Sequence, residues 1–172
     1  SVEIAGGAES DAIDFTSTNY DCKYAVIKGI TFLESINFEN VNLGIGIKFQ
    51  NCSFIKGIYF KNCRAEGYAR EFNSDSVSVY FDGCTIHQIN FPVVSYFERG
   101  IKIFNNTQIS NLNITDVQIP KGSLRIEESA IKESFRLSNI TVGDNGEIII
   151  VKSTIHCSVR YDNLVAGSIG FL

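Results

Sequence analysis

The chain has 172 residues, of which 44% are hydrophobic and 20% are charged, the composition of one ordinary globular domain with a sizeable core. The formal net charge of −4 is mild and names no partner by itself. There is no run of about 18 apolar residues, and no basic region followed by an apolar one is visible at the start, so the sequence predicts neither a membrane span nor a signal peptide. The chain contains no Met, even at position 1, and we therefore expect a processed product or an excised piece of a longer protein.

In chain order, residues 1–12 are small and polar and predict a loose lead-in. Residues 13–35 contain short bursts, by which we mean two apolar residues separated by a single residue. Their irregular spacing predicts an irregular first coil. From 36 to 165 the bursts recur regularly, four to a coil. We therefore expect 1–172 to form a single domain.

The clearest unit spans 46–54, and a near copy starts eleven residues later at 57–65. Each copy alternates apolar and polar residues, as in a strand with one buried face. Similar bursts start at 36, 58, 79, 101, 124 and 148, which are 22, 21, 22, 23 and 24 residues apart. Such short strands need to stack on the next coil. The sequence thus predicts an all-β fold, a single right-handed parallel β-helix of about seven coils with 21–24 residues per coil and almost no helix.

The unit Ile-x-Phe-x-Asn-Cys-x-Phe at 47–54 resembles the pentapeptide-repeat family, in which a central Leu or Phe and a small residue two positions earlier point inward. The residues that match the central position are Phe38, Phe49, Phe54, Phe60, Phe81 and Ile86, and those that match the small one are Cys52, Cys63 and Cys84. The likeness is best over 36–65 and 79–96, and longer steps interrupt it elsewhere.

The chain also resembles the right-handed β-helices of the pectate-lyase type, whose coils have a similar length and often carry Asn at a turn. The residues that match such turns are Asn40, Asn51, Asn62 and Asn105. The two cross-sections stay open as alternatives. Either resemblance implies a fold and not a function.

The cysteines and sequons give opposite indications of the compartment. Cys52, Cys63 and Cys84 occupy the small inward position, so we expect them to be buried free thiols, which favours a reducing compartment. Four Asn-X-Ser/Thr sequons, at Asn51, Asn105, Asn113 and Asn139, favour secretion instead. The localisation stays open.

The longer steps between coils fall at 97–100, 120–123 and 143–147. Stacking would place these turns above one another along a single edge, and insertions in solenoids often collect on the binding face. Ordinary tolerance of loops to insertion explains them equally well. Arg99, Lys121 and Asp144 are the candidate binding residues on this edge.

The expected outward positions form two columns. The first consists of Asn37, Tyr59, Tyr80, Lys102, Arg125 and Ile149, and the second, on the opposite face, of Lys48, Arg70, Asn90, Asn113, Arg136 and Arg160. Tyr beside Lys and Arg would stack on a sugar or base and hold a negative group. We therefore include Tyr59, Tyr80, Lys102 and Arg125 in the candidate partner-binding surface, although solvated strands carry such residues for pairing as well.

Catalytic chemistry is weakly indicated. Asp82 and Glu127 are expected at the same outward position two coils apart, so their carboxylates would be separated by roughly 10 Å. The apolar Phe104 would lie between them, where a glycosidase holds its substrate, so the pair would make a poor glycosidase site. His87 and His156 are expected three coils apart and so would not share a metal. We predict no catalytic, cofactor or metal site.

The sequence therefore favours a non-enzymatic structural or recognition module, which binds a partner through its long-turn edge, the outward stripe or an open end. The expected partner is a protein or a flanking domain of the same chain, with carbohydrate as an alternative and end-to-end self-association as a further expectation. The net charge disfavours nucleic acid. Two alternatives remain: a carbohydrate-active or carbohydrate-binding β-helix, and a DNA mimic of the pentapeptide-repeat type.

Overall fold

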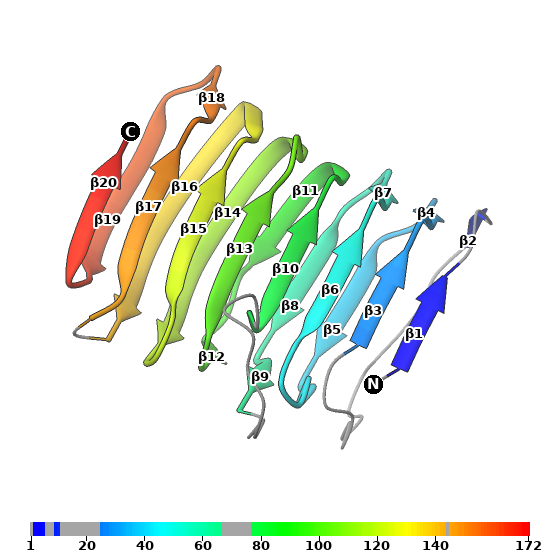
Figure 1. The fold of residues 1–172 in the computed structure, drawn as a ribbon, viewed down its shortest axis with the longest axis horizontal. Coiled ribbons are helices and arrows are strands. Elements are labelled where there is room, and N and C mark those ends of the chain that lie inside the picture. The colour runs from blue at the N-terminus through cyan, green and yellow to red at the C-terminus, as the bar shows by residue number, and fades with distance from the viewer. Residues whose placement is uncertain (1, 6–8, 11–24, 67–76, 144) are drawn as a thin grey trace.

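The computed structural model describes residues 2–5, 9–10, 25–66, 77–143 and 145–172. Within these residues the chain is a parallel β-solenoid without any helix. Figure 1 shows two layers of strands stacked along the long axis, with the two chain ends at opposite ends of the stack. The predicted all-β parallel solenoid is confirmed.

Every strand pairing is parallel and joins one coil to the next. The eight-stranded sheet contains β1 (Val2–Ala5), β3 (Ala25–Lys28), β6 (Ile47–Gln50), β10 (Val79–Asp82), β13 (Gly100–Phe104), β15 (Ser123–Glu127), β17 (Glu147–Val151) and β20 (Ser168–Phe171). The twelve-stranded sheet contains β2 (Glu9–Ser10), β4 (Thr31–Phe32), β5 (Ile36–Glu39), β7 (Ser53–Phe54), β8 (Ile58–Lys61), β9 (Arg64–Ala65), β11 (Thr85–Phe91), β12 (Ser95–Phe97), β14 (Gln108–Ile119), β16 (Ala130–Val142), β18 (Thr154–Ile155) and β19 (Val159–Val165).

The chain makes about six turns over the described residues, slightly fewer than the seven predicted. The first inward residues of the eight-stranded sheet stack in register, and from β3 to β20 they are Ala25, Ile47, Val79, Ile101, Leu124, Ile148 and Ile169. Successive members are 22, 32, 22, 23, 24 and 21 residues apart. The second of these coils is therefore longer than the predicted 21–24 residues.

The predicted coil starts at 36 and 58 are wrong by half a coil. Ile36 and Ile58 pair with each other in the twelve-stranded sheet, and Ile58 pairs onward with Ile89. The eleven-residue unit explains this error, because two copies make one coil and either half serves equally well as the start. The additional residues between Ala65 and Ser78 shift the phase between the two halves.

Alternation within the strands builds the core as predicted. In β6 the inward Ile47 and Phe49 are buried, whereas Lys48 and Gln50 are partly exposed on the outside. Phenylalanines from successive coils stack inside the solenoid: Phe60 lies 4.9 Å from both Phe38 and Phe91, measured between ring centroids. The offset contact of apolar rings adds to the burial of their area.

The corners depend on residues that tolerate a left-handed backbone. The four predicted turn asparagines, Asn40, Asn51, Asn62 and Asn105, have φ angles of 57°, 53°, 51° and 61°. Asn is among the few residues that adopt this conformation at low cost. Their side chains also link coils, since Asn62 Nδ2 donates to Asn40 Oδ1 at 2.7 Å.

The predicted burial of the cysteines is confirmed for the three that occupy the small inward position. Cys52, Cys63 and Cys84 are each at most 1% exposed and are free thiols. Each Sγ lies close to a backbone carbonyl of the preceding coil, as Cys63 does with Phe38 O at 3.3 Å. Burial raises the pKa of Cys63 to about 11. Cys63 therefore fills space at its corner as a neutral thiol.

Candidate functional site

The predicted outward stripe is confirmed in part. Tyr80, Lys102 and Arg125 are in register on β10, β13 and β15. Tyr59 is not part of this stripe, because it lies on β8 in the twelve-stranded sheet and pairs with Asn37 and Asn90. The extra residues after Ala65 place Tyr80 half a coil out of phase with Tyr59, so that Asn90 instead comes one turn after Tyr59.

We call Tyr80, Lys102 and Arg125 the Tyr80 stripe, and its charged groups have close neighbours that satisfy them. Lys48 Nζ lies 2.7 Å from Asp82 Oδ2 and 4.5 Å from the centroid of the Tyr80 ring. Lys102 lies 4.8 Å from the centroid of the Phe104 ring. Tyr80 itself is only 7% exposed.

Further along the same stripe, Glu127 takes two cations. Its carboxylate lies 2.6 Å from Arg125 Nε and 3.8 Å from Lys102 Nζ. Arg125 also reaches Glu147 at 3.4 Å. The stripe is thus a self-contained network of axial ion pairs, which leaves few groups ready for a ligand.

Asp82 and Glu127 are arranged as expected, with the apolar Phe104 between them. Asp82 is in register with Phe104, and Glu127 follows Ile126 on the next strand. Burial alone would raise the pKa of Asp82, but hydrogen bonds from Lys48, Asn105 and Gln50 lower it overall. A carboxylate held ionised in this way is a poor general acid.

The long turns stack along one edge, as predicted. Gly122 packs directly against the backbone of Arg99, and Lys121 N donates to Glu98 O at 2.9 Å. The Lys121 ammonium pairs with the Glu98 carboxylate, whose side chain is only 11% exposed. Asp144 lies outside the described residues. This edge is therefore a ladder of backbone contacts between turns.

The final coil leaves inward positions open to solvent. Ile169 stacks on Ile148 and is 47% exposed, and Phe171 stacks on Ile150 and is 50% exposed. No further coil covers them within the described residues. This is the apolar end at which the sequence suggested self-association.

The second predicted column survives over most of its length. Asn90, Asn113, Arg136 and Arg160 are in register on β11, β14, β16 and β19. Lys48 does not belong to it, since it lies on β6 in the other sheet, and Arg70 lies outside the described residues. Asn37 and Tyr59 occupy the positions before Asn90 instead. We call this set, Asn37, Tyr59, Asn90, Asn113, Arg136 and Arg160, the amide–arginine column.

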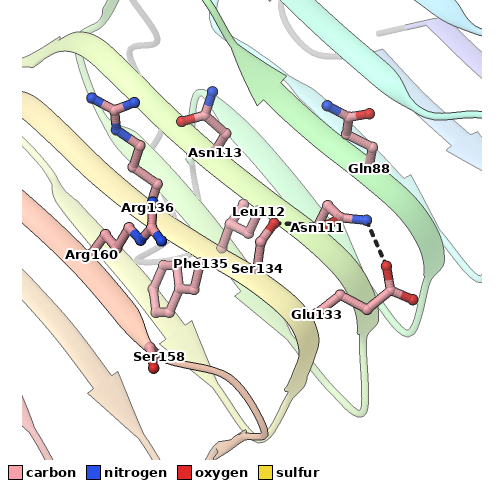
Figure 2. A pocket seen from close by; sticks show the side chains of 10 residues that line it. All are labelled: Gln88, Asn111, Leu112, Asn113, Glu133, Ser134, Phe135, Arg136, Ser158 and Arg160. Atoms are coloured by element: carbon pink, nitrogen blue, oxygen red, sulfur yellow. Dashed lines mark hydrogen bonds between the residues drawn. The ribbon is translucent and has the colours of Figure 1, made fainter.

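A shallow hollow of about 740 Å³ lies over the C-terminal half of this column. Figure 2 shows its lining, with Arg136 and Arg160 next to each other on one side and Glu133 on the other. The remaining polar lining residues are Gln88, Asn111, Asn113, Ser134 and Ser158.

A β-bulge forms the acidic side of this hollow. The register shifts between Ile109 and Asn111, so that Ser110 faces an extra residue on β16. Asn111 Nδ2 donates to Glu133 Oε2 at 3.1 Å, and Ser134 Oγ donates to Asn111 Oδ1 at 2.7 Å. Bulges commonly re-aim side chains beside binding sites.

The two arginines of the hollow differ from most other cations of the chain. Both are exposed, and neither has an acidic partner, a side-chain hydrogen bond or a ring contact within the described residues. An acidic side chain lies within 4.0 Å of the charged group of many other cations, among them Lys48, Lys56, Lys61, Arg64, Lys102, Lys121, Arg125 and Lys152. Arg136 and Arg160 instead face each other across neighbouring strands, where like charges repel.

An unsatisfied acceptor lies in the same column. Asn113 Nδ2 donates to Asn90 Oδ1 at 2.8 Å, while Asn113 Oδ1 is buried and has no hydrogen-bond partner among the described residues. In Figure 2 this oxygen is on the side of Asn113 nearer to Arg136. A buried acceptor without a donor is costly, so free donors line the hollow and an unsatisfied acceptor is buried beside them.

The lining residues that precede the column were missed from the sequence, although a signal was present. Gln88, Asn111, Ser134 and Ser158 each stand two positions before a member of the column, and they are 23, 23 and 24 residues apart. Polar residues that recur at the coil period two positions apart predict two neighbouring outward columns. Reading both columns together would have identified the hollow.

The histidines lie where they were expected. His87 and His156 are exposed and follow equivalent strand positions three coils apart, since Thr85, Gln108, Ala130 and Thr154 stack in that order. Among the described residues, no group of three or more His, Cys, Asp or Glu side chains is arranged to hold a metal ion. The same part of the chain has no helix long and apolar enough to cross a bilayer.

Comparisons of the chain with protein families, with curated proteins and with solved structures found no match. Inference about function therefore rests on the geometry of the amide–arginine column.

Proposed function

We propose that the chain is a non-enzymatic recognition module that binds an anionic partner on the amide–arginine column. The observation that carries this proposal is the in-register pair of Arg136 and Arg160, exposed and without an acidic neighbour in the described part of the chain. The solenoid supplies a rigid support, because each outward residue stands on a strand paired on both sides over most of the stack.

The energetics of the arginine pair favour a ligand. Arg136 and Arg160 occupy paired positions on neighbouring strands about 4.8 Å apart, so two cations stand on adjoining coils with no anion between them among the described residues. Elsewhere on the chain the same spacing is used for attraction, as when Lys56 pairs with Glu34 of the preceding coil. An anion bound between Arg136 and Arg160 would turn the repulsion into two charge-assisted hydrogen bonds.

The other predicted surfaces have less support. The Tyr80 stripe already satisfies its charges internally, and the long-turn edge consists mainly of backbone contacts. Catalysis by Asp82 and Glu127 would require a substrate in place of Phe104, and Asp82 is engaged by Lys48. The carbohydrate-active alternative therefore reduces to carbohydrate binding.

The likeness to the pentapeptide-repeat family rests on the inward cysteines and phenylalanines of 36–65 and 79–96. A DNA mimic of that family type would need a continuous acidic stripe. Three acidic residues of the eight-stranded sheet, Asp82, Glu127 and Glu147, are instead each paired with a cation. We rank this alternative last.

Mapping the surface with three anionic probes tests the proposed function. Amide chemical shifts of the labelled protein would be followed during titration with hexaglutamate, oligogalacturonate and a dextran sulfate fragment. We expect at least one probe to perturb the amides around Arg136, Arg160 and Asn113 and to lose this effect in an Arg136→Glu/Arg160→Glu double variant. Perturbations at Lys102 and Arg125 alone, or none with any probe, would refute the proposal.

A further inference from the structure

On the basis of the proposed function, we infer that the anionic partner is a linear glycan bearing carboxylate or sulfate groups. Its acidic groups lie on Arg136 and Arg160, and its hydroxyls on the amides and hydroxyls of the neighbouring column. Uronic acids and sulfated sugars share the chemistry that this site recognises, namely an anionic group beside several hydroxyls.

The lining of the hollow indicates a sugar. Apart from the two arginines and Glu133, its exposed or partly exposed lining consists of Gln88, Asn111, Asn113, Ser134 and Ser158. Amides and hydroxyls both donate and accept hydrogen bonds, as sugar hydroxyls do. The buried Asn113 Oδ1 has no donor among the described residues, so a small shift of this amide that exposed the oxygen would suit a hydroxyl donor and not a bare anion.

The spacing of the two columns suits an elongated chain. Members of one column repeat about every 4.8 Å along the solenoid, and the two columns stand two residues apart on each strand. A hexose unit in an extended glycan advances by a similar distance. A glycan laid along the axis would therefore meet a new member of each column at every sugar. It would meet the two arginines where it passes over the C-terminal coils of the solenoid.

Glu133 makes the hollow asymmetric across the bound chain, because it stands on the same strand as Arg136. It lies opposite the arginines and is held by Asn111 at 3.1 Å. Its charge disfavours a second acidic group at that side while its oxygens accept sugar hydroxyls. The hollow is thus asymmetric, with an anion-binding side and a hydroxyl-binding side.

Two other macromolecules fit less well. An acidic peptide would gain from apolar pockets or a free sheet edge, but no exposed large hydrophobic side chain of the described residues lines the hollow, and its strands pair on both sides except at β19. Single-stranded nucleic acid needs aromatic platforms for its bases, and none of the described aromatic residues lining the hollow is exposed.

Binding of matched polymers by calorimetry tests the inference on the full chain. The probes are oligogalacturonate, the same oligosaccharide with its carboxylates methyl-esterified, dextran sulfate with neutral dextran as its control, and polyglutamate. The variants are Arg136→Gln and Arg160→Gln, singly and together. Arg64→Gln serves as a matched control, since its side chain is 65% exposed on another face and pairs with Glu66.

We expect binding to oligogalacturonate or dextran sulfate, no binding to the uncharged forms, and weaker binding at higher salt. Each Arg→Gln change should weaken binding about tenfold, as loss of a charge-assisted hydrogen bond does. Glu133→Gln should strengthen it by about threefold, because it removes a repulsive charge. Arg64→Gln should leave it unchanged.

The outcomes separate the inference from the function on which it rests. Polyglutamate could bind as strongly as the acidic glycans and be equally sensitive to the arginine substitutions. This result would refute the inference that the partner is a glycan, but it would leave the proposed anion-recognition function intact. Glycan binding that persists in the double variant, or no binding of any polyanion, would overturn both.

Discussion

Replacing Phe60 by alanine removes the ring at the centre of the aromatic core. Phe60 is fully buried and stacks at 4.9 Å on Phe38 in the preceding coil and on Phe91 in the next. It also meets Phe81 and Phe97 edge-on, at 6.5 and 6.2 Å. The cavity would therefore be surrounded by strands that cannot close around it without breaking their register.

The expected loss in free energy of unfolding is about 4–5 kcal/mol, the upper part of the range for a buried Phe→Ala change. Phe171→Ala is the control, because its ring is 50% exposed and has a coil on one side only. We expect about 1–2 kcal/mol for it, from roughly half of the apolar area. Urea denaturation followed by circular dichroism measures both, with the slope compared to detect any loss of cooperativity.

A double variant that also changes Phe91 to alanine tests the stacking itself. The coupling energy between the two positions should be about 0.5–1.5 kcal/mol. A loss below about 2 kcal/mol for Phe60→Ala, or a loss equal to that of Phe171→Ala, would contradict a tightly packed aromatic core around Phe60.

Three further predictions concern charge and ionisation. Arg136→Gln should raise the free energy of unfolding by about 0.2–1 kcal/mol in the absence of ligand, because it relieves a like-charge pair. A lower free energy of unfolding for the variant, measured by urea denaturation, would contradict this. The lowered pKa of Asp82 stabilises the fold above about pH 4, the unfolded value, and this contribution is lost as the pH falls through the native value. Asp82→Asn should therefore lower stability at pH 7 and flatten its decline in acid, and a parallel decline in both proteins would refute this. Cys63, buried and with a pKa raised to about 11, should resist a maleimide at pH 8, whereas the partly exposed Cys157 should react. Peptide mapping by mass spectrometry locates the label, and equal labelling of the two thiols would be the contrary result.

The sequence by itself determined the local structure of each coil. The alternation in Ile47-Lys48-Phe49-Gln50 fixes which side chains point inward, because side chains of a strand point to opposite faces in turn. Asn51 and Asn62 mark the corners, because Asn tolerates positive φ. These properties belong to a few neighbouring residues, so they can be read without knowledge of the fold.

Only the tertiary structure decided which coils share a face. Tyr59 was expected beside Tyr80 but lies beside Asn90, because the residues between Ala65 and Ser78 lengthen one coil by about half a turn, so that Asn90 comes one full turn after Tyr59. The same shift brings Asn37 and Tyr59 into the amide–arginine column, whereas the register of Arg136 with Arg160 follows the ordinary coil length and could be predicted from the sequence. Registry between strands depends on the total length of chain between them, and two near-identical eleven-residue units per coil carry no local signal that distinguishes one face from the other.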